Sequence, residues 1–154
     1  MKYADFGSIS HATMRNEDLI PCFRDELEAL LSCQSKRFKR KEYRAVIREA
    51  DKIIKSEDWD SEDAGYALEA LFDALQAFAP PYAYFGANEG DGSDYGFWLD
   101  CDFPSHNFDG LKVSGLSDIP KSYRGEVLEI NDHGNMTFGY VNSRGDFKTV
   151  WVLV

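Results

Sequence analysis

The sequence lacks any apolar run long enough to cross a membrane. A transmembrane helix needs about 20 apolar residues, whereas the longest strongly apolar stretch of these 154 residues is the short segment 150–154. Residues 1–6 also lack the apolar core of a secretory signal peptide. We therefore expect a soluble, cytoplasmic protein with no membrane partner.

Cysteine is scarce, and its three copies form no CxxC pair. Cys22 and Cys33 lie on one predicted helix, about 16 Å apart along its axis, whereas a disulfide needs Cα atoms within about 7 Å of each other. The pattern predicts three reduced, mostly buried thiols. A reactive alternative, with Cys101 as nucleophile and His106 as base, lacks the nucleophile elbow and oxyanion loop of such sites.

Motifs for metal and phosphate chemistry are absent as well. His11, His106 and His133 are isolated, without HExxH or Cys/His spacing. The segment 88–99 fails as an EF-hand loop because its positions 3, 5 and 12 are Gly, Gly and Leu. Its glycines precede no predicted helix, so it is not a phosphate loop either. The sequence predicts no catalytic residue, metal or cofactor, and it favours a function other than catalysis.

Lysine and arginine are missing from residues 57–111, a stretch that holds thirteen acids. The whole chain has a net charge of −10 and an isoelectric point near 4.7. A protein this acidic is repelled by nucleic acid and anionic membranes, so we expect no direct nucleic-acid binding. The charge favours a basic protein or a nucleoprotein complex as partner.

A basic block precedes the acidic stretch, with nine basic residues and three acids between positions 36 and 55. Its run 36–41 could be read as a nucleic-acid patch. A solvated helix face, or an internal counterpart of the acidic stretch, is favoured because the overall field is negative.

The apolar spacing changes once along the chain. Helical periodicity predicts helices at 18–32, 41–55 and 61–79, with Asp60 as the N-cap of the third. After Pro81 a period of two predicts strands. Their predicted positions are 82–85 and 95–99 around a loop at 87–94, a short strand at 111–113, and strands at 126–131, 136–142 and 147–154. We expect a single α+β domain, residues 1–154, with about three N-terminal amphipathic helices packed on a C-terminal antiparallel meander of roughly five strands.

Several local motifs carry a resemblance. The chain resembles small uncharacterised acidic proteins encoded by bacteriophages and other mobile elements. The matching segments are Leu71-Phe72-Asp73-Ala74-Leu75, Ala79-Pro80-Pro81-Tyr82, Tyr84-Phe85-Gly86, Gly90-Asp91-Gly92-Ser93-Asp94-Tyr95-Gly96-Phe97-Trp98, Asp18-Leu19-Ile20-Pro21, Glu126-Val127-Leu128 and Asn131-Asp132-His133-Gly134-Asn135. This resemblance implies a genomic setting in which small acidic accessory proteins often inhibit host defence, as anti-CRISPR and anti-restriction proteins do.

The acidic stretch with its interleaved aromatic residues is the strongest functional candidate. Carboxylates steer a basic partner toward a surface, and exposed aromatic rings anchor it there. Nucleic-acid mimicry is a related possibility, and an ordinary acidic surface with inward-pointing rings is the alternative. The expected partner-binding residues are Asp60, Glu62, Asp63, Glu89, Asp91, Asp94, Tyr95, Asp100, Asp102 and Asp109.

Three functional hypotheses follow. The first is a phage or mobile-element protein that inhibits a host defence system without catalysis, in the host cytoplasm, as a monomer or small homo-oligomer. The second is a small-molecule-binding protein or small enzyme, whose pocket between helices and sheet is lined by Tyr82, Tyr84, Trp98 and Trp151. The third is a structural protein that oligomerises through the strand at 147–154.

Overall fold

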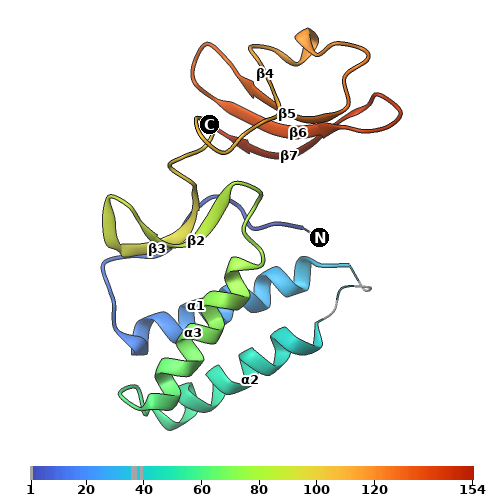
Figure 1. Ribbon diagram of the computed structural model, residues 1–154. Coiled ribbons are helices and arrows are strands. Elements are labelled where there is room, and N and C mark those ends of the chain that lie inside the picture. Colours follow the sequence, from blue (N-terminus) through green and yellow to red (C-terminus); the bar gives the residue numbers. More distant parts are fainter. Residues whose placement is uncertain (1, 36–37, 39) are drawn as a thin grey trace. The chain divides into compact units, whose positions relative to one another are not determined.

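The computed structural model describes residues 2–35, 38 and 40–154, which form two compact units (Figure 1). Unit 1 is Met1–Asp100 and unit 2 is Cys101–Val154. Helices and a three-stranded sheet make up unit 1, and a four-stranded sheet makes up unit 2. The α+β class is confirmed, but one meander of about five strands is not, because the strands form two separate sheets. The single domain stays a prediction.

Helices form where the apolar spacing predicts them, because each helix gains a buried stripe. The third helix is capped by Ser61, whose hydroxyl accepts the Ala64 N–H, so the expected cap at Asp60 is wrong by one residue. None of the helices within the described residues is both long and apolar enough to span a membrane. The helices are α1 (Asn16–Cys33), α2 (Lys41–Ser56) and α3 (Glu62–Gln76).

Aromatic rings fill the core of unit 1. The fully buried ring of Phe23 on α1 makes edge-to-face contacts with Phe72 and Phe85, at centroid distances of 5.2 and 5.1 Å. Phe97 packs against Phe85 from the neighbouring strand, at 5.0 Å. Such pairs stabilise a core beyond the area that they bury. The space between the helices and the sheet of unit 1 therefore holds packed side chains.

The sheet of unit 1 is antiparallel, in the order β1-β3-β2. Its first strand was not predicted, because Gly-Ser-Ile-Ser has little strand propensity and lies far in sequence from its partner. The other two strands extend into the predicted loop and leave a short turn at 89–90. The strands are β1 (Gly7–Ser10), β2 (Ala83–Asn88) and β3 (Asp91–Leu99).

Unit 2 contains the predicted C-terminal meander together with one parallel strand. The order is β4-β5-β6-β7, and β5, β6 and β7 pair antiparallel as expected. The parallel pairing of β4 with β5 corrects the purely antiparallel prediction, and the long connection 114–124 returns the chain to the same end of the sheet. The strands are β4 (Leu111–Val113), β5 (Gly125–Ile130), β6 (Met136–Val141) and β7 (Phe147–Leu153).

The two hairpin turns of unit 2 are stabilised in the same way, by an asparagine side chain. The Asn131 side chain accepts the backbone N–H groups of His133 and Asn135, and Asn142 does the same for Arg144 and Asp146. The glycine of each turn has a positive φ, +82° in one turn and +92° in the other, which explains its presence. His133 therefore lies in a turn, as the sequence predicts.

The cysteine prediction is confirmed only in part. No disulfide forms among Cys22, Cys33 and Cys101. Cys33 and Cys101 are exposed, so the prediction that the thiols are mostly buried was wrong. Cys22 is half-buried and its thiol donates to the Ile9 carbonyl over 2.9 Å. Burial, together with the nearby acids of α1, raises the pKa of this thiol, which keeps it protonated and unreactive.

Candidate functional site

Four carboxylates cluster in sequence at the N-terminal end of α3, and all four are exposed. We call Asp58, Asp60, Glu62 and Asp63 the α3 acidic group. Three of them were predicted as binding residues. Asp58 was not, although it lies in the same turn. Beside them the ring of Tyr66 is 59% exposed, and its hydroxyl donates to Glu62 over 2.8 Å. That hydrogen bond raises the pKa of the Tyr66 hydroxyl.

Hydrogen bonds fix the turn that carries this group. The Ser61 hydroxyl donates to the Asp58 carbonyl over 2.7 Å while it accepts the Ala64 N–H at 3.2 Å. On the other side, the Asn16 side chain of α1 donates to the Trp59 carbonyl over 2.8 Å. The turn is thus tied to both α1 and α3, so the carboxylates project from an anchored backbone.

The charge of the α3 acidic group is not neutralised locally. Within the part of the chain that the structure describes, no Lys or Arg forms an ion pair with any of the four carboxylates. The dipole of α3 contributes only about +0.5 charge at this end. Four negative charges therefore remain largely uncompensated and available to an external cation.

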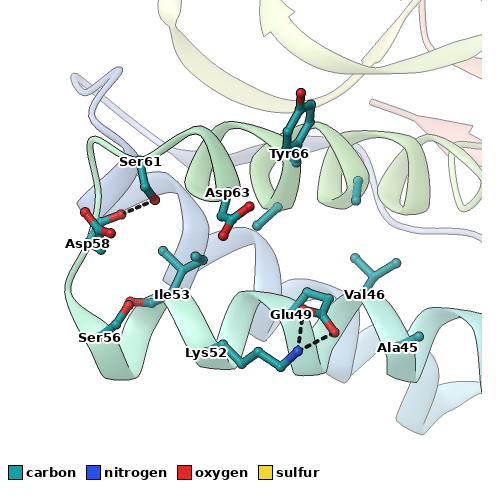
Figure 2. Close-up of a pocket in the computed structure, with 12 residues that line it drawn as sticks. Ala45, Val46, Glu49, Lys52, Ile53, Ser56, Asp58, Ser61, Asp63 and Tyr66 are labelled. Carbon is teal, nitrogen blue, oxygen red and sulfur yellow. Dashed lines mark hydrogen bonds and ion pairs between the residues drawn. The ribbon is translucent and has the colours of Figure 1, made fainter.

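A groove of about 630 Å³ lies between α2 and α3, next to the acidic group (Figure 2). Its floor is apolar, with Val46 and Ile53 directed from α2 toward α3 (Figure 2). The small Ala67 of α3 also lines it. Asp58 and Asp63 line one end. The other residues that line it are Ala45, Glu49, Lys52, Ser56, Ser61, Tyr66 and Ala70.

A second set of predicted residues lies on the hairpin of β2 and β3. Glu89 and Asp91 are exposed at its tip. Asp91 accepts the backbone N–H and the hydroxyl of Ser93, and these hydrogen bonds lower the pKa of its carboxyl. Asp94 is half-buried, and its carboxylate lies 3.0 Å from Nδ1 of His11. Glu89 and Asp91 thus offer an accessible charge, whereas Asp94 is half-buried beside His11.

Tyr95 faces the core instead of the solvent. Its ring contacts Phe23 and Phe72 edge to face, each at 5.7 Å between centroids. The inward-pointing alternative therefore describes this residue. Other aromatic residues of the hairpin also satisfy their polar atoms locally: Trp98 donates to the Gly86 carbonyl over 3.0 Å, and the Tyr84 hydroxyl donates to the Ala87 carbonyl over 3.2 Å.

The remaining predicted residues are found at and after the end of unit 1. Asp100 closes unit 1, whereas Asp102 and Asp109 belong to unit 2. The acidic stretch is therefore divided between the units, and the α3 acidic group and the hairpin acids both belong to unit 1. Trp151, proposed as a pocket residue, packs within unit 2 against Phe138, at 5.3 Å between ring centroids.

Two clusters around residue 101 could be read as reactive sites. Asp100, Cys101 and Asp102 are consecutive residues at the junction of the two units. Two hard oxygens and one soft sulfur match neither the oxygen sets of Ca²⁺ and Mg²⁺ nor the Cys/His sets of structural Zn²⁺, so we assign no metal. The second cluster is a pair of side chains in which Nδ1 of His106 lies 3.7 Å from a carboxylate oxygen of Asp102. The His106 ring is exposed.

The basic face of α2 is solvated, as the sequence favours. Arg44, Arg48, Lys52 and Lys55 are all exposed, and Lys52 pairs with Glu49 of the same helix over 2.7 Å. No ion pair connects these four cations to the acidic stretch within the described residues. Lys36, Arg37 and Lys39 of the basic run lie outside the described residues.

The sequence contained signals for part of what it missed. Asp58 lies two residues before Asp60 in the same acid-rich turn. This position was therefore a reason to include Asp58 among the predicted binding residues. Tyr66 lies off the apolar stripe of α3, which is a sign of exposure. Comparison with known proteins adds no relative: neither a protein-family model, a curated protein nor a solved structure matches the chain significantly.

Proposed function

We propose that this protein is a non-enzymatic inhibitor of a host defence system, of anti-CRISPR or anti-restriction type, encoded by a phage or mobile element. It acts in the host cytoplasm by occupying a basic surface of a protein or nucleoprotein complex. The observation that carries the proposal is the α3 acidic group: four exposed carboxylates without an ion-pair partner among the described residues, beside an exposed tyrosine.

Electrostatics supports a target that normally binds nucleic acid. Such a protein needs clustered Lys and Arg side chains to neutralise phosphates. An acidic surface can occupy the same cluster, and the opposite charges accelerate association. Mimicry of nucleic acid is the stronger version of this proposal. The resemblance to phage and mobile-element proteins supplies the biological setting.

A binding role also suits the exposure of the carboxylates. A general acid or base works within hydrogen-bond reach of a bound substrate, usually in a pocket that excludes water. The α3 acidic group is solvated on an anchored turn, so its charge is presented outward. This geometry favours recognition of a partner's cations over chemistry on a bound substrate.

The test combines capture of a partner with charge reversal. Proteins retained from a host lysate are identified, and the affinity of the purified partner is measured for Asp60→Lys/Glu62→Lys/Asp63→Lys. The proposal predicts a loss of at least about tenfold, since each exposed charge contact contributes up to about 1 kcal/mol. A control with the same change in net charge, Glu126→Lys/Asp132→Lys/Asp146→Lys in unit 2, should retain affinity.

Function is tested by phage plating on a host that carries the defence system. Expression of the wild-type protein should restore plaques, and the α3 charge-reversed variant should not. If neither protein changes plating on any host whose defence protein is captured, inhibition is the wrong activity. If the control in unit 2 loses affinity as strongly as the α3 variant, net charge alone explains binding and the α3 surface is the wrong site.

A second candidate function has one specific observation in its favour. The closing strand β7 lies at the edge of its sheet, and Val152 on it is 51% exposed. An edge strand can pair with a second copy of the chain, which supports the assembly hypothesis. Light scattering across a range of concentrations tests the assembly hypothesis, because a protein that stays monomeric at high concentration does not act by oligomerising.

A further inference from the structure

The groove between α2 and α3 suggests the shape of the partner that it binds, and this inference rests on the proposed function. The groove is partly open to solvent, in contrast to an enclosed cavity for a small molecule. Its lining on α2 runs from Ala45 to Ser56, which corresponds to about 16 Å or three helical turns. That length suits a segment of a partner chain.

The walls of the groove favour a helix over an extended peptide. Both walls are α-helices, so their backbone N–H and C=O groups are already bonded within α2 and α3. An extended peptide would find no strand edge here and would leave its own backbone groups unpaired. A helix satisfies these groups internally and needs to offer only side chains. On α3, the half-buried Ala70 leaves room for such side chains above the buried Ala67.

Charge is distributed unevenly along the groove. Asp58 and Asp63 line the end near the start of α3, whereas Ala45, Val46 and Ala70 line the opposite part. The Glu49–Lys52 pair lies between them and is neutral as a unit, with the ammonium 2.7 Å from the carboxylate. The occupant therefore needs basic residues at one end and apolar residues along the remainder.

We infer that the groove binds a basic amphipathic helix of the partner, with the N-terminal end of that helix against Asp58 and Asp63. The orientation follows from the dipole of the bound helix, whose positive end is its N-terminus and is stabilised by nearby carboxylates. Basic side chains in its first two turns reach the acidic end. Apolar side chains spaced three and four residues apart lie on the accessible Ala45, Val46 and Ala70, because Ile53 and Ala67 beneath them are already buried.

Two synthetic peptides of identical composition test this inference. One carries its Lys and Arg residues in the first two turns and the other in the last two, with the same apolar spacing and blocked ends. Fluorescence anisotropy should give the first peptide an affinity at least about fivefold higher, because the contact of its cations and its helix N-terminus with Asp58 and Asp63 exceeds the unfavourable effect of cations at the positive end of its own dipole. Equal affinities, or no saturable binding of either peptide, would overturn the inference.

Variants locate the binding in the groove. Ala45→Trp places a large ring in the groove from an exposed position and should weaken the first peptide at least about tenfold. Asp58→Asn/Asp63→Asn should remove the preference between the two peptides. Matched controls are Ala29→Trp on α1 and the two-charge variant Glu69→Gln/Asp73→Asn on α3, all at exposed positions outside the groove, and both should bind as wild type.

The natural partner separates this inference from the proposed function. If its binding depends on the α3 acidic group but is unchanged by Ala45→Trp, the inference is wrong and the proposed function stands. If the affinity of the natural partner does not change when the α3 charges are reversed, the proposed function is wrong, whichever peptide binds more tightly. Circular dichroism of each variant confirms that loss of binding is not loss of fold.

Discussion

The Ser61 hydroxyl donates a hydrogen bond to the backbone carbonyl of Asp58 over 2.7 Å, and so connects the start of α3 to the acidic turn before it. The same oxygen caps α3 by accepting the Ala64 N–H. Ser61→Ala removes both contacts and should lower the free energy of unfolding by about 1 kcal/mol. Chemical denaturation measures the effect.

Ser61→Thr is the rescue for this prediction, because threonine keeps a hydroxyl that can donate and accept. Its stability should be close to that of the wild type. In partner binding, Ser61→Ala should also weaken affinity modestly, since the carboxylates lose their anchored turn. Equal stability of the alanine and wild-type proteins would show that the cap contributes nothing.

Glu26 on α1 should destabilise the folded protein at neutral pH. Burial, and next the nearby Asp5 carboxylate, raise the pKa of Glu26. The protonated form is therefore favoured in the folded state, and a penalty is present once the carboxyl ionises. Glu26→Gln should unfold at a higher denaturant concentration at pH 7, and the difference should vanish below about pH 4.3, where both states are protonated. A less stable variant at pH 7 would contradict this account.

Asp18 should have the opposite pH dependence. Hydrogen bonds from Thr13, at 2.6 Å, and from Arg15, at 2.9 Å, lower the pKa of its carboxyl. The stability that ionised Asp18 gives the folded protein is fully present above the unfolded-state pKa of about 3.9. It is lost as the pH falls through the lower pKa of the folded state. Asp18→Asn should be less stable than wild type at pH 7 and equal to it in strong acid. A constant difference at every pH would refute the assignment.

Gly96 is required by the close approach of β1 to β3. A Cβ atom at this position would lie 2.2 Å from the Gly7 carbonyl oxygen, which belongs to the backbone and cannot move aside alone. Gly96→Ala should cost about 1–3 kcal/mol of stability. Gly92→Ala is the control on the same strand, because nothing lies within 4 Å of its Cβ. Its stability should change by less than about 0.5 kcal/mol.

The helices could be predicted from the sequence because their apolar residues recur at helical spacing over three or more turns. The strand β1 could not, since Gly7 and Ser8 have low strand propensity and pair only after β3 approaches them. The parallel pairing of β4 could not be predicted either, because a strand of three residues does not indicate whether it pairs parallel or antiparallel with its neighbour. Long-range pairing thus decided what local pattern could not.

The candidate site was predictable in charge but not in shape. Asp60, Glu62 and Asp63 lie where an acid-rich helix start predicts exposed carboxylates. The groove could not be predicted, because alanines such as Ala67 are equally compatible with close helix packing. The orientation of Tyr95 was readable in principle: it lies two residues before buried Phe97, and a strand places such residues on one face.

The dependence of the partner's association rate on ionic strength tests the central claim most directly. Stopped-flow or surface measurements would follow wild type and the α3 charge-reversed variant between about 0.05 and 0.5 M salt, where screening shortens from roughly 14 Å to 4 Å. The account predicts a rate that falls at least about tenfold for wild type and is nearly flat for the variant. A wild-type rate independent of salt, or the same slope for both proteins, would contradict it.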